Sequence, residues 1–255
     1  QYLQYGSPHE DNFLYQNNGD GTFTKIITGE IVNDGGNSHG SAWADFNNDG
    51  FLDIIVTNDQ FGLNYLYSNN GIGTFTIFEN IINSEEINSF GTAWSDYDKD
   101  GDMDLYIANH SDQLNTFYTN SRANCNSWSC IDLEGVVSNK NGIGAKVRVK
   151  ANIYGQDVWQ MREISAQTGG GSGGQNSMNV LFGLGDAISI DSIQIEWPSG
   201  IVQYFTNQAP NTCLEVPEEN NEQICGTVYH DENANCIQDA GEVGIANAVI
   251  EILPG

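Results

Sequence analysis

Basic side chains are scarce in this chain of 255 residues: 8 lysines and arginines stand against 34 aspartates and glutamates, for a formal net charge of −26. No basic stripe could neutralise the phosphates of a nucleic acid, and the same shortage disfavours binding to an anionic membrane surface. Proline is rare as well, and no apolar run reaches the roughly 18 residues of a membrane-spanning helix. Asparagine, glycine, serine and threonine are abundant instead, which favours a β-rich, turn-rich secreted protein of one or two domains.

Cysteine usage argues against a metal–thiolate site. The five cysteines form no C-x-x-C pair, and none stands with histidines at zinc-binding spacing. Cys125 and Cys130 could close a small loop, and Cys225 and Cys236 could bracket a strand and the loop after it. Buried free thiols are the alternative to these two pairings. Cys213 is then left over, or competes for Cys225.

Two acidic stretches of nearly identical sequence, residues 45–53 and 96–104, are the most informative feature. Oxygen-bearing side chains occupy positions 1, 3, 5 and 9: Asp45, Asn47, Asp49 and Asp53 in the first stretch, and Asp96, Asp98, Asp100 and Asp104 in the second. Glycine stands at position 6, and the backbone carbonyl of position 7, Phe51 or Asp102, can complete a ligand shell. Without a cation, carboxylates ~4–5 Å apart repel by about 1 kcal/mol per pair even in water. The spacing therefore predicts two loops that bind Ca²⁺.

The two stretches begin 51 residues apart, and the sequence around them repeats at the same period. Residues 40–43 (Gly-Ser-Ala-Trp) correspond to 91–94 (Gly-Thr-Ala-Trp), and each acidic stretch runs into a short apolar segment. An Asn-rich element at 64–71 has copies at 115–120 and 12–19. Short alternating apolar runs separated by Asn-Gly turns are typical of β-hairpins. One repeat then supplies about four short strands, as in one blade of a β-propeller.

These residues resemble the FG-GAP/VCBS repeats of integrin-like β-propellers, and the resemblance extends over residues 1–120. It implies that each D-x-D-x-D-G-x-x-D hairpin binds Ca²⁺. Two full repeats and one half-repeat cannot close a propeller, which has typically 4–8 blades. Residues 2–5 align with the apolar run that should follow an acidic loop, so we expect further blades upstream of this sequence.

From about residue 121 the repeat stops, and alternating segments at 131–136, 145–150 and 189–197 predict half-buried strands. Five sequence anchors resemble the ASPIC/UnbV domain over residues 121–217. The anchors are Asn141-Gly-Ile-Gly144 with Ala-Lys-Val147, Arg162-Glu163, Gly174-Gln-Asn-Ser177, Phe182-Gly-Leu-Gly185 and Trp197-Pro-Ser-Gly200. The family implies a β-sandwich-like module. It often has histidine where this chain has Leu181, so no role of that histidine is carried over.

Five of the eight basic residues cluster within residues 140–162: Lys140, Lys146, Arg148, Lys150 and Arg162. They could form a docking face for the acidic repeats. Alternation along a strand also places charged residues on its solvent face. We favour this second interpretation.

A polar linker at 218–223 leads into a last segment, residues 224–255. Its oxygen ligands at positions 1, 3, 5, 9 and 12 are Asp231, Asn233, Asn235, Asp239 and Glu242, with the carbonyl of Ile237 at position 7. This is the spacing of an EF-hand, but Cys236 replaces the glycine of position 6 and strand-like segments flank the loop. The segment resembles the start of the calcium-binding, immunoglobulin-like B-type repeats of Sdr surface adhesins, which implies a third Ca²⁺ site. A polar Asx-rich turn is the alternative. The segment is too short to bury a core alone, so we expect it to be truncated.

No residue pattern points to catalysis. The four histidines, at positions 9, 39, 110 and 230, are scattered, and none has a visible nucleophile and acid for a triad. Acid pairs suited to glycoside hydrolysis are already assigned as calcium ligands. The glycine-rich stretch 169–174 lacks the Lys-Ser/Thr of a phosphate loop and a following helix, so we predict a turn there.

Taken together, the sequence predicts an all-β protein with a partial β-propeller, a β-sandwich-like ASPIC/UnbV domain and an incomplete immunoglobulin-like module. We expect a non-enzymatic, calcium-binding protein of adhesion or scaffolding type, extracellular or anchored to a bacterial surface, with a protein or polysaccharide ligand. A carbohydrate-active enzyme or lyase whose catalytic residues lie on missing blades is one alternative. A structural subunit of an extracellular fibre, which would self-assemble, is the other.

Overall fold

The computed structural model describes residues 11–84, 86–121, 125–168 and 174–219. All of these belong to the first of two compact units, Gln1–Glu219, and the second unit is Asn220–Gly255. The described residues form strands and two short 3₁₀ helices, Glu30–Val32 (η1) and Ile81–Ser84 (η2). In this part of the chain, no helix is long and apolar enough to cross a membrane. The predicted all-β class is confirmed.

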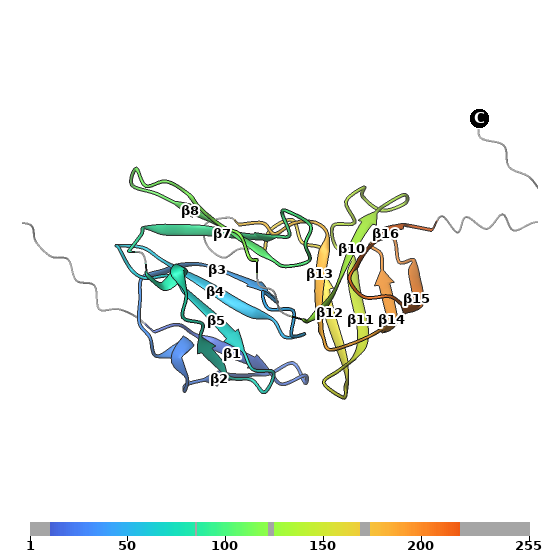
Figure 1. The fold of residues 1–255 in the computed structure, drawn as a ribbon, viewed down its shortest axis with the longest axis horizontal. Helices are drawn as coiled ribbons and strands as arrows, with labels where there is room; N and C mark the ends of the chain where they lie inside the picture. The colour runs from blue at the N-terminus through green and yellow to red at the C-terminus, as the bar shows by residue number, and fades with distance from the viewer. Residues whose placement is uncertain (1–10, 85, 122–124, 169–173, 220–255) are drawn as a thin grey trace, which may run out of the picture. The chain divides into compact units, whose positions relative to one another are not determined.

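The repeat region forms three antiparallel sheets, coloured blue to green in Figure 1. Their strands are β1 (Leu14–Asn17) and β2 (Phe23–Ile26); β3 (Ser38–Ala44), β4 (Asp53–Asn58), β5 (Tyr65–Asn69) and β6 (Phe75–Ile77); and β7 (Ser89–Ser95), β8 (Asp104–Asn109) and β9 (Thr116–Tyr118). Each strand pairs with the next along the chain, so every sheet is a meander. The four-stranded meander β3–β6 is the unit of a propeller blade.

The second domain is a sandwich of two sheets. One sheet has the order β12-β11-β14-β15 and the other β13-β10-β16. Their strands are β10 (Ser127–Glu134), β11 (Lys146–Ile153), β12 (Gln156–Glu163), β13 (Val180–Gly185), β14 (Ile190–Glu196), β15 (Val202–Gln208) and β16 (Thr212–Pro217). All pairings are antiparallel except that of β10 with β16, which run parallel. The predicted β-sandwich is confirmed.

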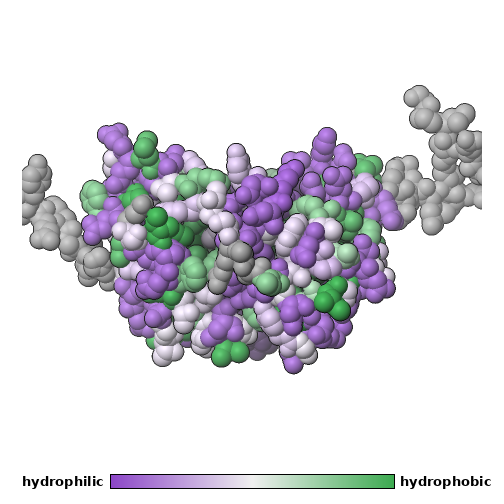
Figure 2. All heavy atoms as spheres, in the orientation of Figure 1, coloured by the Kyte–Doolittle hydropathy of each residue, from purple (hydrophilic) through white to green (hydrophobic). Residues whose placement is uncertain are grey.

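Alternation along β11 shows how the sandwich core forms. Val147 and Val149 point inward and are fully buried, together with isoleucines of β14 and Phe182 of β13. Lys146, Arg148 and Lys150 alternate with these two valines along the strand and lie on its solvent-facing side, as we predicted for the basic residues of this strand. In Figure 2, hydrophilic residues cover much of the visible face of the described chain, and hydrophobic residues are scattered among them.

The repeats and the sandwich share one buried apolar cluster. Ala44, Trp94 and Met103 of the repeats pack there with Cys130 and Leu181 of the sandwich. Burial of apolar surface contributes about 25 cal/mol per Å². Repeats and sandwich are therefore joined by this shared cluster within the first compact unit.

One of the sequence anchors of the second domain supplies polar contacts at this junction. The side-chain oxygen of Asn176 accepts a hydrogen bond from the Trp94 backbone N–H at 3.0 Å. The Ser177 N–H donates to the Trp94 carbonyl at 3.0 Å, and the Asn176 amide nitrogen donates to the Trp43 carbonyl at 3.3 Å. The anchor at 174–177 thus contacts the tryptophan of both Gly-x-Ala-Trp segments.

The disulfide differs from the one predicted. Cys130 of β10 is bonded to Cys213 of β16, whereas the sequence suggested Cys125 as its partner. The parallel register places Cys130 directly opposite Cys213, although they are 83 residues apart in the chain. Cys125 is a free, exposed thiol. Pairing by closeness in sequence was wrong here because strand register decides which sulfur atoms meet.

Glu218 fastens the end of the sandwich. Its carboxylate is buried and accepts hydrogen bonds from the backbone N–H groups of Val136, Val137 and Ser138 at 2.9, 2.8 and 2.6 Å. The hydroxyls of Ser138 and Ser199 donate to it at 2.8 and 2.5 Å. Burial opposes ionisation, but these hydrogen bonds outweigh it and lower the pKa of Glu218 to about 2. The group is therefore ionised at neutral pH and serves as a structural acceptor.

Candidate functional site

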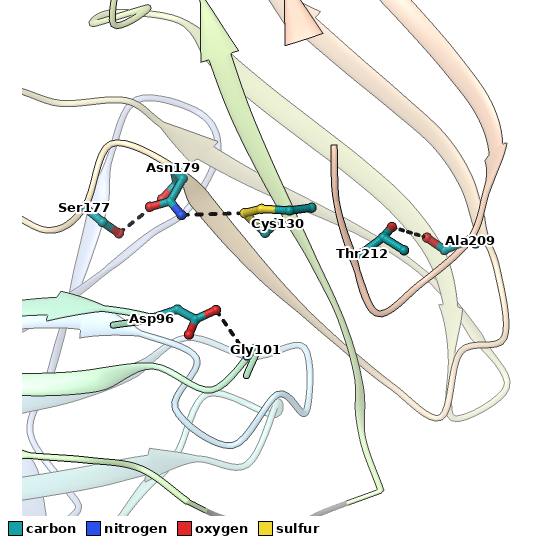
Figure 3. The surroundings of a disulfide bond; sticks show 8 residues. Asp96, Gly101, Cys130, Ser177, Asn179, Ala209 and Thr212 are labelled. Atoms are coloured by element: carbon teal, nitrogen blue, oxygen red, sulfur yellow. Dashed lines mark hydrogen bonds between the residues drawn. A yellow bond between two sulfur atoms is a disulfide. The ribbon is translucent and has the colours of Figure 1, made fainter. Parts of the chain in front are cut away.

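The two acidic stretches form equivalent loops: loop 1 (residues 45–53) joins β3 to β4, and loop 2 (residues 96–104) joins β7 to β8. In both loops, the carboxylate of position 1 accepts a hydrogen bond from the backbone N–H of position 6. The carboxylate of position 9 accepts a hydrogen bond from the backbone N–H of position 2. The pairs are Asp45 with Gly50 (2.8 Å), Asp53 with Phe46 (3.1 Å), Asp96 with Gly101 (3.1 Å) and Asp104 with Tyr97 (2.8 Å). Figure 3 draws the third of these. The sequence repeat is thus matched by a repeat of hydrogen bonds.

Backbone conformation explains the glycine of position 6. Gly50 and Gly101 have φ values of 95° and 92°, in the region that side-chain-bearing residues rarely adopt. Asn48 and Lys99, both at position 4, also have positive φ, 57° and 64°. The chain therefore turns tightly within each loop, and in loop 2 the side chains of positions 1, 3 and 9 converge.

Loop 2 brings together three of its four predicted side-chain ligands, and Asp100 is not part of the group. Oxygen atoms of Asp96, Asp98 and Asp104 lie within 4.8 Å of one another. Asp96 Oδ1 is buried and has no hydrogen-bond partner. A buried oxygen without a hydrogen-bond donor, placed among other carboxylates, is suited to coordinate a cation. Ca²⁺ prefers oxygen ligands of this kind.

When no cation is bound, burial and neighbouring charges oppose the ionisation of several carboxylates in the two loops. Burial raises the pKa of Asp102 to about 6, with neighbouring acids of loop 2 adding to the shift. In loop 1, burial raises the pKa of Asp45 to about 7 and that of Asp53 to about 8, and the charge of Asp49 contributes to both. A bound divalent cation reverses this effect because it favours the ionised forms. The donor set and its electrostatics both suit Ca²⁺.

The two loops touch each other and the second domain, which the sequence did not predict. The side-chain nitrogen of Asn48, 1% exposed, donates to the Gly101 carbonyl at 3.0 Å and to Asp102 Oδ1 at 2.8 Å. The carbonyl of Asn48 accepts from the N–H of Gly185 at 2.8 Å. Asn48 therefore links loop 1, loop 2 and strand β13.

The Phe-Gly-Leu-Gly anchor of the second domain lies against loop 1. A Cβ atom on Gly183 would lie 2.1 Å from Asp45 Oδ2, so only glycine allows this approach. The Arg162 guanidinium stacks 4.9 Å from the centre of the Phe182 ring. Burial lowers the pKa of Arg162 to about 10, and its charge partly offsets the raised pKa of Asp45. Of the basic cluster in the sequence, Arg162 is thus directed at the acidic repeats.

The remaining predicted ligands are placed as follows. Asn47 Oδ1 accepts from the N–H of Asp49 at 2.9 Å, and Asp98 and Asp100 accept equivalent backbone hydrogen bonds in loop 2. Phe51, expected to offer its carbonyl, packs its ring against Gly71. The predicted C-terminal ligands (Asp231, Asn233, Asn235, Ile237, Asp239 and Glu242) and the pair Cys225 and Cys236 lie outside the described residues. Calcium binding by all three loops stays a prediction.

Sequence reasoning missed a histidine cluster between the repeats. Asp59 accepts from His110 Nε2 at 2.6 Å and has His39 Nε2 at 3.7 Å. Phe90 packs against both imidazoles, with ring centres 4.4 Å apart in each pair. The Ser111 hydroxyl lies 2.7 Å from His110 Nδ1, so a Ser–His–Asp chain exists. We interpret this cluster as a bridge between the repeats, because Asp59 belongs to the first repeat and His110 to the second. Asp59 and His110 occupy equivalent repeat positions, after Asn58 and Asn109, which was the available signal.

A cavity of about 380 Å³ lies between the two repeats. Aromatic and aliphatic side chains line it, among them Phe46, Leu66 and Trp94, with a few amide and hydroxyl groups. Among the described residues that line it, Tyr118 alone carries an ionisable side chain.

Comparison with known families agrees with this architecture. Residues 3–56 and 45–107 match the model of the FG-GAP-like repeat, and residues 135–223 match the model described as ASPIC and UnbV. No curated protein matches the chain. The chain carries FG-GAP-like repeats followed by an ASPIC and UnbV domain, as its sequence anchors predicted. These repeats are typical of extracellular proteins, and the combination is typical of β-rich proteins of an adhesion type. The domain limits at 120 and 217 and the module at 224–255 stay predictions.

Proposed function

We propose that this protein is a calcium-stabilised, non-enzymatic scaffold or adhesin of the extracellular space or cell surface. The observation that carries the proposal is the matched pair of loops, whose carboxylates converge on one point in loop 2 and leave Asp96 Oδ1 without a partner. Cations in these loops would act as structural ties between adjacent strands.

Calcium should contribute measurable stability. At millimolar calcium and a dissociation constant of ~10⁻⁴ M, each site adds about 1.4 kcal/mol. For a domain of this size that corresponds to roughly 3–6 °C of melting temperature per site. We expect chelation with EDTA to lower the melting temperature of the full chain by several degrees.

A matched pair of variants makes this test specific. Asp98→Asn removes a carboxylate that faces the cation position, and Asp112→Asn removes an exposed carboxylate outside the loops. Isothermal titration with CaCl₂ should show weaker binding in the first variant and unchanged binding in the second. A melting temperature that EDTA does not alter would remove the calcium proposal. Turnover of polysaccharides by the purified chain would contradict the non-enzymatic role.

A further inference from the structure

The outer face of the sheet β12-β11-β14-β15 carries large side chains with unusual exposure. Trp159 is 54% exposed, Met161 49% and Tyr204 65%. Residues paired directly across neighbouring strands form rows on one face of a sheet. One row runs Met161, Arg148, Gln194, Tyr204, and the next runs Trp159, Lys150, Ser192, Thr206. The face thus has apolar and aromatic groups at its two edges and hydrogen-bonding groups in its middle.

The two aromatic groups are not needed by the fold. Within the described residues, the side chains of Trp159 and Tyr204 make no hydrogen bond and no ring contact. By contrast, the indole nitrogens of Trp94 and Trp197 are buried and donate to Ala42 and Gln203. Tryptophan and tyrosine side chains combine a large apolar surface with a polar group, and both commonly serve in recognition when exposed.

Charge on this face is balanced, unlike that of the chain as a whole. Arg148 pairs with Glu196 at 3.1 Å, and Lys150 pairs with Asp157 at 2.8 Å. A polyanion would have to displace these pairs and approach a chain of net charge −26. The lysine, aspartate and glutamate residues of these pairs also belong to the types that are depleted at the centre of protein interfaces. An uncharged ligand with many hydroxyl groups meets neither obstacle.

We propose that this face binds a neutral polysaccharide. Sugar rings expose C–H groups on one side, and these pack on the electron-rich faces of Trp159 and Tyr204. Arg148 has free N–H donors besides the one that contacts Glu196, and Gln194 offers both a donor and an acceptor to sugar hydroxyls. The edges of the sheet are three strand spacings apart, about 14 Å, which several consecutive sugar rings span. The site is independent of the cation loops, so calcium binding and polysaccharide binding can fail separately.

Affinity electrophoresis of the full chain tests the proposal. The native gels contain a soluble β-1,3-glucan, a β-1,4-xylan or a mannan, and a further gel contains alginate as the polyanion. We expect at least one neutral polysaccharide to retard the wild type and alginate to leave it unretarded. Trp159→Ala and Tyr204→Ala should each weaken the retardation about tenfold or more, as expected for loss of a central aromatic contact.

Two exposed aromatic residues of the repeats serve as matched controls. Phe61 is 60% exposed and Tyr15 is 54% exposed, and neither lies on the sandwich. Phe61→Ala and Tyr15→Ala should bind as the wild type does, and all four variants should keep its melting temperature because the substituted side chains are exposed. Three results would each overturn the proposal: no retardation by any neutral polysaccharide, retardation by alginate alone, or equal losses in the control variants.

Discussion

Asn48 is the residue through which the two loops should depend on each other. Its buried side chain donates to the Gly101 carbonyl and to a carboxylate oxygen of Asp102. A hydrogen bond to a neutral acceptor contributes about 1 kcal/mol and one to a charged acceptor about 1.5–3 kcal/mol. Asn48→Gly keeps the positive φ without strain and removes both bonds. We therefore expect the free energy of unfolding to fall by about 2.5–4 kcal/mol.

Loop 2 supplies the control at the equivalent position. Lys99 also has positive φ, but its side chain is exposed and is not hydrogen-bonded to loop 1. Lys99→Gly relieves the backbone without removing a contact, so it should be neutral or stabilise the protein by up to about 1 kcal/mol. The difference between Asn48→Gly and Lys99→Gly then measures the two hydrogen bonds.

Urea unfolding followed by fluorescence is the appropriate assay. For small proteins the free energy of unfolding falls by about 1–3 kcal/mol per molar urea. A loss of about 3 kcal/mol in this free energy therefore lowers the urea concentration at the unfolding midpoint by about 1 M or more. The loss should persist in EDTA, because both hydrogen bonds are between protein groups. If the two variants have midpoints that differ by less than the experimental error, the link through Asn48 contributes nothing to stability.

Two further predictions concern the second domain. The pKa of Glu218 is lowered to about 2, so its ionised form contributes roughly 3 kcal/mol above pH 4.5, and this contribution is lost as the pH falls toward 2. In Glu218→Gln, the free energy of unfolding should therefore fall less steeply as the pH is lowered, whereas Glu219→Gln should keep the wild-type pH dependence. An identical pH dependence in the two variants would argue against the role of the buried carboxylate. Replacing Cys130 and Cys213 together by alanine opens a covalent loop of 83 residues and should lower the free energy of unfolding by about 4 kcal/mol in urea titrations. Cys125→Ser should leave the midpoint unchanged, and an equal loss in that variant would contradict the observed pairing.

The sequence predicted local structure well because local structure has local causes. Glycine at position 6 and carboxylates at fixed spacing led to both loops, and the structure shows the same hydrogen bonds in each. Alternation at 145–150 and 189–197 located two strands of the sandwich, β11 and β14. In these cases the residues that specify the feature are the residues that form it.

Long-range contacts were not predictable in the same way. The hydrogen bond from the Gly185 N–H to the Asn48 carbonyl joins two backbone groups. Any residue type has these groups, so the sequence does not indicate which of them pair. The Phe-Gly-Leu-Gly anchor could be recognised in the sequence as a motif. The requirement for glycine at position 183 comes from its close approach to Asp45, which only the tertiary structure reveals. The partner of Cys130 likewise depends on the register of β10 and β16.

The disulfide also sets the covalent path along which this chain would carry a tensile force. The sulfur bridge joins the first and last strands of the sandwich, which run parallel and adjacent. A pull between the repeats and the chain beyond β16 enters at β10 and leaves across the bridge to β16. The residues between Cys130 and Cys213 then lie off the loaded path. Strands β11 to β15, including the exposed face with Trp159 and Tyr204, can stay folded while the chain carries force.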